Sequence, residues 1–339
     1  MAIRKVSVAN ATREEWLAVR SGTIGGSDAG AVVGLSPWKS AFTLWAEMTG
    51  RAKPFEGNLA TDVGTYLEEF VAKKFQEATG LQVLRSNFIY FNDDYPNQHA
   101  TPDRILRQTG QYGLGGLKCG LEIKTTNGFG RFKGGEEGFP EQYYAQCCQY
   151  LAVMGYDVWF LAVLVGNREI HFYEMRRDEK LPVPDFVEGN IVADQAEMDA
   201  LKEACDDFMR KVADDTPPLP DGDERTSKAV DDAYPVASDE STILYGQDEN
   251  AEKLFQLKQD MKGLKTEIDR LTNIFKADMG ECAEASCGRY IMKWQNVSST
   301  TLDSKKLKEM DPETWKKYSK TNTTRKFTMT MKKEEDTNG

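Results

Sequence analysis

The pattern of apolar and polar positions divides the first 177 residues into helical segments followed by strands. Apolar residues recur every three or four positions in four early segments, which predicts helices at 13–20, 27–33, 41–48 and 62–78. The period then changes to two, which predicts strands at 83–91, 101–107 and 121–125. A further helix is expected around 141–155, followed by a continuous apolar strand at 157–165 and an alternating strand at 168–176. This order predicts an α/β fold, with a mixed β-sheet flanked by helices.

The second half of the chain shows two apolar stripes with coiled-coil spacing. One has alternating steps of three and four residues and consists of Leu254, Leu257, Met261, Leu264, Ile268, Leu271 and Phe275. The other repeats this spacing with Met198, Leu201, Cys205, Phe208 and Val212. We expect the two helices to pack against each other as an antiparallel coiled-coil hairpin, a C-terminal helical extension of the core. Contacts between copies of the chain are the alternative use of either stripe.

These patterns predict the organisation of the whole chain. We expect a core with a trailing helix at 1–213, followed by an acidic linker at 214–250 that contains the proline-rich run 216–220. A coiled-coil-like helix at 251–280, a basic accessory segment at 281–333 and a tail at 334–339 complete the chain. No apolar run approaches the ~20 residues that a membrane helix needs, and the N-terminus has no signal-peptide core. We therefore expect a cytoplasmic protein that does not enter a membrane.

The tripeptide Glu122-Ile123-Lys124 carries the candidate chemistry. Alternate side chains of a strand share a face, so Glu122 and Lys124 point the same way while Ile123 packs behind them. The preceding strand carries Asp103 after Pro102 and can place it beside Glu122. Mg²⁺ takes oxygen ligands and usually only one or two carboxylates, which Asp103, Glu122 and the Ile123 carbonyl would supply.

Lys124 completes the chemistry expected of a metal-dependent phosphodiesterase. A metal-bound water loses its proton more easily, and a partly desolvated lysine can orient this water or neutralise developing charge. The spacing E-x-K also occurs by chance in ordinary amphipathic strands, with a residue such as Asp103 serving as a turn former. The triplet alone therefore leaves both interpretations open.

Motifs elsewhere in the chain resemble a known family. The stretch from Glu15 to Gly30, continued by residues 33–38, resembles the opening signature of the YqaJ-type phage recombinase nucleases, which are similar to lambda exonuclease. Further motifs follow in the family's order: a G-x-x-x-E helix at 64–68, a PD-(D/E)XK core formed by 102–103 and 122–124, and a Y-x-x-Q-type helix at 144–146. In this helix Tyr144 is one residue too close to Gln146, unless Tyr143 is the counterpart. The resemblance covers residues 12–177, and more weakly the closing R-x-F strand at 323–327.

The resemblance implies the roles of several site residues. Asp103 and Glu122 would be metal ligands, Lys124 the catalytic lysine, Glu68 an auxiliary acid and Gln146 a helix residue near the site. Helical geometry turns Glu68 and its neighbour Glu69 about 100° apart, so only one of the two can line the site. For Gln146, a buried amide that bonds backbone is the alternative.

A 5′-phosphate pocket is also implied by the resemblance. The family holds the terminal phosphate with an Arg and a Ser seven residues apart and a hydroxyl two residues before the catalytic Asp, and this chain has Arg20, Ser27 and Thr101 at those positions. Arginine binds phosphate bidentately, and Ser27 precedes a predicted helix whose N-terminus favours anions. A plain helix N-cap is the alternative for Ser27.

The net charge of −11 is unfavourable for a protein that binds DNA, because lysine and arginine supply most nonspecific affinity. The acidity is confined, however. Residues 1–177 have 19 basic and 19 acidic side chains, 178–253 have 7 and 22, and 305–333 have 10 and 3. The basic segment is a candidate DNA-backbone contact through Lys305, Lys306, Lys316, Lys317, Arg325 and Lys326, and a solvated tail is its alternative. In the glycine-rich run 128–138, Arg131 and Lys133 would contact DNA from a substrate loop, unless the run is a plain connector.

The resemblance implies a restriction-endonuclease-like core and a Mg²⁺-dependent 5′→3′ exonuclease, with Mn²⁺ as the alternative ion. The substrate would be double-stranded DNA ends, resected for a single-strand annealing recombinase in phage-type recombination, and a homotrimer ring is the implied assembly. A structure-specific or nonspecific endonuclease is the alternative on the same core, and an inactive DNA-binding module is the alternative of another class. Six cysteines without a C-x-x-C pair, and only two histidines, indicate neither a zinc site nor an iron–sulfur site.

Overall fold

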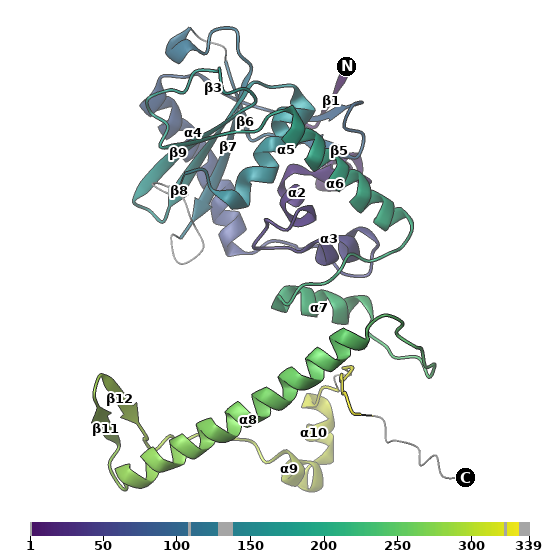
Figure 1. Ribbon diagram of the computed structural model, residues 1–339, viewed down its shortest axis with the longest axis vertical. Helices are drawn as coiled ribbons and strands as arrows, with labels where there is room; N and C mark the ends of the chain where they lie inside the picture. The colour runs from purple at the N-terminus through teal and green to yellow at the C-terminus, as the bar shows by residue number, and fades with distance from the viewer. Residues whose placement is uncertain (1, 108–109, 128–137, 322–323, 332–339) are drawn as a thin grey trace. The chain divides into compact units, whose positions relative to one another are not determined.

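The computed structural model describes residues 2–107, 110–127, 138–321 and 324–331, and the chain divides into two units (Figure 1). The first unit is Met1–Tyr234 and the second is Pro235–Gly339. Among the described residues, no helix is long and apolar enough to cross a membrane. The predicted DNA contacts of Arg131 and Lys133 lie outside the described residues.

The main sheet of the first unit has six strands in the order β10-β9-β8-β7-β6-β3. Their bounds are β3 Val83–Arg85, β6 Arg104–Leu106, β7 Cys119–Thr126, β8 Val158–Val165, β9 Glu169–Arg176 and β10 Gly189–Val192. The pairs β7–β8 and β9–β10 are parallel and the others antiparallel, so the sheet is mixed. β8 is apolar throughout and buried except at its last residue, as its composition predicted. The predicted mixed sheet flanked by helices is confirmed.

A second sheet of four strands has the order β1-β4-β5-β2, with bounds Ile3–Ser7, Phe88–Asn92, Gln98–Ala100 and Ile24–Gly25. The sequence pattern predicted single strands at 83–91 and 101–107. The first region divides between the two sheets as β3 and β4, whereas the second contains only β6, and β5 ends just before it. β3 and β4 belong to different sheets, as do β5 and β6. Pro102 has no N–H to donate to a ladder, so the chain leaves one sheet before it and enters the other after it. Asp103 lies at this crossing.

Helices of the first unit cover both faces of the main sheet (Figure 1). Their bounds are α1 Arg13–Arg20, α2 Gly26–Val32, α3 Ala41–Met48, α4 Leu59–Thr79, α5 Tyr144–Met154, α6 Gln195–Ala213 and α7 Glu224–Ala233. Short 3₁₀ turns occur at Gln111–Gly113 and Glu141–Tyr143. α4 packs on β7, β3 and β8, whereas α5 contacts β4, β5, β8 and β9 and is buried at all positions but its first. The two faces have separate apolar clusters, one around Phe75 and Phe160 and the other around α5.

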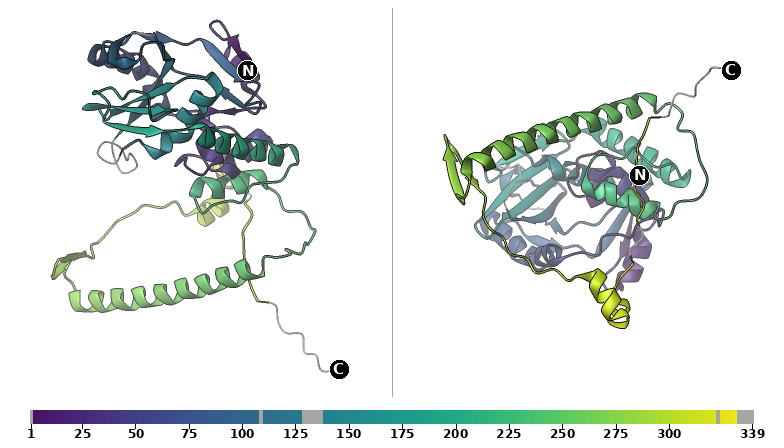
Figure 2. Two further views of the ribbon diagram at one scale, coloured as in Figure 1. Left: turned by 45° about the horizontal axis from the view of Figure 1, so that its top comes forward. Right: turned by 90° about the horizontal axis from the view of Figure 1, so that it is seen from below.

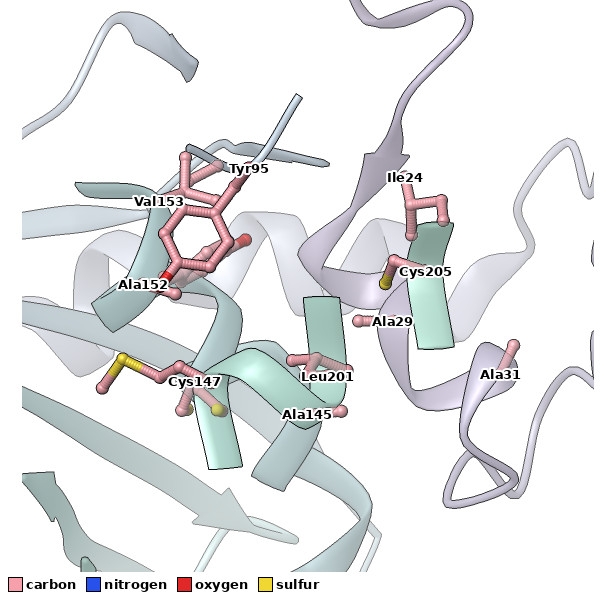
Figure 3. Packing of buried hydrophobic residues seen from close by; sticks show 14 of the residues in the cluster. Ile24, Ala29, Ala31, Tyr95, Ala145, Cys147, Ala152, Val153, Leu201 and Cys205 are labelled. Atoms are coloured by element: carbon pink, nitrogen blue, oxygen red, sulfur yellow. The ribbon is translucent and has the colours of Figure 1, made fainter. Parts of the chain in front are cut away.

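The apolar stripe of α6 is part of this core. Met198, Leu201, Cys205 and Phe208 are buried with residues of α2 and α5, and Figure 3 shows Leu201 and Cys205 among them. α6 contacts α2, α3 and α5. The predicted hairpin between this helix and residues 251–280 is therefore wrong. A stripe of period 3.5 predicts that a face is buried but does not identify what covers it.

Residues 224–233, inside the segment expected to be a linker, form α7, which packs on α3. Ala229 is buried, and the Thr226 hydroxyl lies 2.7 Å from that of Ser40. The first unit thus continues beyond α6.

The second unit contains α8 Asp248–Met279, β11 Glu284–Cys287, β12 Tyr290–Lys293, α9 Ser304–Met310 and α10 Pro312–Tyr318. α8 is one continuous helix of 32 residues, and the hairpin β11–β12 follows its C-terminal end (Figure 2). Lys305 and Lys306 lie on α9, Lys316 and Lys317 on α10, and Arg325 and Lys326 beyond it. Residues 324–331 are not a strand, so the R-x-F resemblance does not extend to secondary structure there.

Candidate active site

The candidate site forms where β6 begins and β7 passes beside it. Asp103 directly precedes β6, and its Oδ2 accepts a hydrogen bond of 2.9 Å from the Ile123 amide. The Ile123 side chain is buried in the apolar cluster of the α4 side. The alternation of β7 then turns Glu122 and Lys124 to the other face. The structure therefore brings the three predicted residues Asp103, Glu122 and Lys124 together.

Glu122 is at the centre of the group, and its side chain is only 3% exposed. Its Oε1 accepts hydrogen bonds from Lys124 Nζ at 2.7 Å and from Gln146 Nε2 at 2.6 Å. Its Oε2 is buried and has no hydrogen-bond partner among the described residues. Burial, and next the Asp103 charge, raise the pKa of Glu122 to about 8.

Charges in the group influence one another strongly. Burial raises the pKa of Asp103, although Lys124 and the Ile123 amide act in the opposite direction. Burial alone would lower the pKa of Lys124, but the charges of Glu122 and Asp103 raise it above its usual value. Lys124 Nζ also lies 5.6 Å from the ring centroid of Tyr143. Two carboxylates with one ammonium leave the group one negative charge in excess when all three are ionised.

The donor set fits a hard divalent cation. The described residues contain no group of three or more His, Cys, Asp or Glu side chains at metal-binding spacing. Mg²⁺ needs only one or two carboxylates, however, because water and substrate oxygens complete its shell. The unpartnered Oε2 of Glu122 and the Asp103 carboxylate supply that number, and the Ile123 carbonyl follows in the same strand.

Glu68 approaches the site from α4. Its side chain is 29% exposed against 62% for Glu69, and both surround the buried Arg104, at 3.8 Å and 3.3 Å from the guanidinium. Burial, and next the charge of Asp103, raise the pKa of Glu68. α4 passes close to β7, because a Cβ on Gly64 would lie 3.2 Å from Thr125 Oγ1. Of the two adjacent glutamates, Glu68 is the one that interacts with the carboxylates.

Tyr150 is a site residue that the sequence patterns did not identify. Its hydroxyl accepts a hydrogen bond of 3.0 Å from Gln146 Nε2 and donates one of 3.1 Å to the Thr101 carbonyl. α5 thereby connects Glu122 to the loop that precedes Asp103. The signal available in the sequence was the four-residue spacing of Gln146 and Tyr150, which places both on one helix face.

Gln149 has a different role from Gln146. Its Nε2 donates to the carbonyls of Ile24 and His99, both at 2.8 Å, and it is fully buried. It is the buried amide that bonds backbone, and it joins α5 to β2 and β5. Gln146 instead bonds the Glu122 carboxylate.

Arg20 is held in place by a closed set of contacts. Its Nε donates to His99 Nε2 at 2.8 Å, and its guanidinium carbon lies 4.0 Å from the centroid of the Trp16 ring. His99 Nε2 is therefore the acceptor, so Nδ1 carries the proton and donates to Thr23 Oγ1 at 2.9 Å. The Thr23 hydroxyl in turn donates to the Arg20 carbonyl at 3.1 Å. Burial, and next Arg20, lower the pKa of His99 to about 3, so this ring is neutral.

Ser27 and Thr101 lie just beyond the strand pair β2–β5, which also carries His99, the partner of Arg20. β2 and β5 run parallel with Gly25 opposite His99, so Ser27 and Thr101 each follow by two residues. Ser27 is exposed in the first turn of α2, whose N-cap is Gly25, so the N-cap alternative for Ser27 is wrong. No hydrogen bond among the described residues links the side chains of Arg20, Ser27 and Thr101 directly. The pocket they would form remains a prediction.

A mixed sheet that places two carboxylates and a lysine together, just before β6 and on β7, is compatible with the chemistry of a nuclease. Residues 15–157 match the YqaJ-like viral recombinase domain. The chain is similar to this family over these residues.

Similar proteins are found both by sequence, over most of the chain, and among solved structures. The chain is 29% identical over 325 residues to the uncharacterized protein YqaJ of Bacillus subtilis (strain 168), covering 93% of each. An alkaline exonuclease (LHK-Exo) from Laribacter hongkongensis has a TM-score of 0.43 and 19% identity, over 60% of this chain and 94% of that one. A phage related exonuclease from Haemophilus somnus 129PT has a TM-score of 0.39 and 14% identity, over 57% and 96%.

Proposed function

We propose that this protein is a Mg²⁺-dependent exonuclease that degrades double-stranded DNA from its 5′ ends, with Mn²⁺ as an alternative ion. The observation that carries the proposal is the buried Glu122 carboxylate, which has one oxygen engaged and one without a partner, beside Asp103 and Lys124. The Lys124 ammonium engages only Oε1, and the buried Oε2 is costly to leave without a cation or a proton. Similarity of residues 15–157 to a recombinase domain supports DNA as the substrate.

Each side chain has a defined task in phosphodiester hydrolysis. When bound, Mg²⁺ supplies Lewis-acid polarisation of the phosphate and activation of water. Gln146 and Lys124 occupy Oε1 of Glu122 and so direct Oε2 toward the ion. Lys124 then neutralises charge that develops on the scissile phosphate, and Glu68 accepts or supplies a proton at the edge of the group.

The end preference would come from Arg20. Its Nε is engaged by His99 and its plane rests on Trp16, which leaves the terminal amino groups to bind a phosphate in a fixed orientation. A Cβ on Gly25 would lie 2.7 Å from Arg20 Nη2, so any larger residue there would displace this guanidinium. Ser27 and Thr101 would add hydroxyl donors.

The test compares linear duplex DNA with and without a 5′ phosphate against closed circular DNA, all in Mg²⁺. We expect degradation of the linear phosphorylated substrate, little degradation of the circle, and loss of activity in Lys124→Ala. Lys118→Ala, an exposed lysine that precedes the same strand, is the matched control and should remain active. Cleavage of the circle at a comparable rate would refute the exonuclease and support the endonuclease alternative.

A second variant tests the phosphate pocket separately. Arg20→Ala should reduce the ratio of rates on phosphorylated and unphosphorylated ends while Mg²⁺ binding is unchanged. Arg13→Ala, at the exposed start of the same helix, should leave this ratio unaltered. An unchanged ratio in Arg20→Ala would refute the pocket but not the nuclease.

The rest of the proposal concerns partners. We infer that the 3′ single strands left by such an enzyme pass to a single-strand annealing recombinase, and that a homotrimer ring around the duplex would keep the enzyme on its substrate. The basic residues of α9, α10 and the following segment would contact the DNA backbone, because the rest of the chain has few excess positive charges. Steeper loss of DNA affinity with salt in wild type than in a Lys316→Gln/Lys317→Gln variant would support that contact.

A further inference from the structure

α8 presents a long apolar stripe that the described part of the chain leaves uncovered. Its seven members are between 36% and 66% exposed, and they are Leu254, Leu257, Met261, Leu264, Ile268, Leu271 and Phe275. The stripe runs over 22 residues, or about 32 Å of helix from its first to its last member. A continuous apolar surface of this size on a soluble helix indicates an interaction site.

The order of residues in the stripe favours a two-stranded coiled coil. Assigning Leu254 to heptad position a places Met261, Ile268 and Phe275 at a as well. The d positions are then all leucine, at 257, 264 and 271. Leucine at every d position suits a parallel dimer, and of the four a positions Ile268 is the one with the β-branched residue that this arrangement favours.

Charges beside the stripe favour a second copy of the same helix in parallel orientation. The same assignment places Lys258 and Lys265 at e, and Asp260 and Glu267 at g. In a parallel pair each g residue faces the e residue of the following heptad in the other helix, so Asp260 faces Lys265 of the second copy, twice by symmetry. In an antiparallel pair g faces g and e faces e, which would oppose acids to acids and lysines to lysines.

Residues at the two ends of the stripe contribute differently. Lys253 at g would face Lys258 of the second copy, an unfavourable contact in the first heptad. Ile274 at g is apolar and 44% exposed, and it widens the seam at the other end. The favourable charge pair therefore lies in the middle of the helix, where both strands are best ordered.

We propose that α8 pairs with α8 of a second copy of this chain as a parallel, in-register, two-stranded coiled coil. The pairing would couple two chains through their second units, or two rings where the first units assemble as the homotrimer ring proposed above, and either assembly doubles the mass. The proposed pairing is independent of the proposed nuclease activity, because the mass of the protein in solution tests it.

Sedimentation of the full-length protein tests the pairing. Leu264→Lys places a charge at the central d position, and Gln259→Lys places the same charge at f on the opposite face. We expect the mass of wild type and of Gln259→Lys to be twice that of Leu264→Lys. Equal masses for all three proteins would overturn the proposal, as would a threefold ratio.

Disulfide trapping tests the orientation. Leu257→Cys is made together with Cys282→Ser and Cys287→Ser, which removes the exposed cysteines. A parallel, in-register pair places the two 257 positions in contact, whereas an antiparallel pair packs d against a and would place 257 near 268. We expect an intermolecular disulfide for Leu257→Cys and none for Gln259→Cys in the same background. No cross-link at 257 in a protein of dimeric mass would overturn the parallel arrangement.

Charge reversal tests the argument from complementarity. In a parallel pair Asp260→Lys opposes lysine to lysine, so the dissociation constant should rise several-fold. Adding Lys265→Asp should restore it, since the pair is then reversed but complementary. Tighter association of the single variant is the result expected of an antiparallel pair and would contradict the proposal.

Discussion

Substitution of Glu122 by glutamine separates the metal site from the packing of the core. The change removes a charge from a side chain that is 3% exposed and keeps its shape and its acceptor toward Gln146. Without a divalent ion the charged form of Glu122 is unfavourable, since burial and the Asp103 charge raise its pKa from 4.5 to about 8. The folded protein therefore holds a proton that the unfolded chain releases.

The sign and size of the effect follow from this difference. Because the folded state binds more protons between pH 4.5 and 8, the contribution of Glu122 to stability is fully present below pH 4.5 and is lost as the pH rises through 8. At about 1.4 kcal/mol per pKa unit, the loss is roughly 1 kcal/mol at pH 5 and roughly 3 kcal/mol at pH 7. Wild type should thus lose roughly 2 kcal/mol more than Glu122→Gln between pH 5 and pH 7.

The assay is urea unfolding in EDTA at both pH values, followed by the fluorescence of the buried Trp45 and Trp159 of the first unit. The comparison between pH values cancels packing effects of the substitution. Glu56→Gln, an exposed carboxylate that is in water before and after unfolding, is the control. Excess Mg²⁺ should stabilise wild type but not Glu122→Gln. A stability difference between the two proteins that is the same at pH 5 and pH 7 would refute the reasoning.

Three further predictions concern residues around the site. His99→Leu should lower the preference for phosphorylated ends toward that of Arg20→Ala, because Arg20 loses its Nε acceptor, and rates on both substrates measure this. Gly120→Ala should destabilise the first unit by about 1–3 kcal/mol, since its Cβ would lie 2.4 Å from the Trp159 ring, and thermal unfolding tests this. Tyr150→Phe should cost about 1–3 kcal/mol and slow hydrolysis, and a stable variant with full activity would exclude Tyr150 from the site.

The chemistry of the central strand was predictable from local sequence. Alternation along β7 places Glu122 and Lys124 on one face whatever the strand pairs with, and the buried run of β8 indicates a central strand by composition alone. Strand boundaries were less predictable. The division of 83–91 between two sheets depends on which partner each half finds, and Pro102 was the local sign of the break between β5 and β6.

Other site residues depend on contacts between distant segments. Tyr150 reads as one more apolar position of a buried helix until α5 is placed against the Thr101 loop. His99 lies 79 residues after Arg20 in the sequence, and the two side chains meet only because β2 and β5 pair in parallel. The sequence gives no local sign of either contact, since hydrogen bonds between distant segments depend on the fold.

The two apolar stripes also separate what the sequence determines from what the tertiary structure decides. By itself the sequence determined that the stretches 198–212 and 251–280 form amphipathic helices, because a 3.5-residue period requires one apolar face per helix, and α6 and α8 cover these stretches but for Gly280. Only the tertiary structure decided that the first face is buried against α2, α3 and α5 while the second is exposed. Burial is a nondirectional driving force, so a stripe specifies that it must be covered and leaves the choice of cover to the packing of the whole chain.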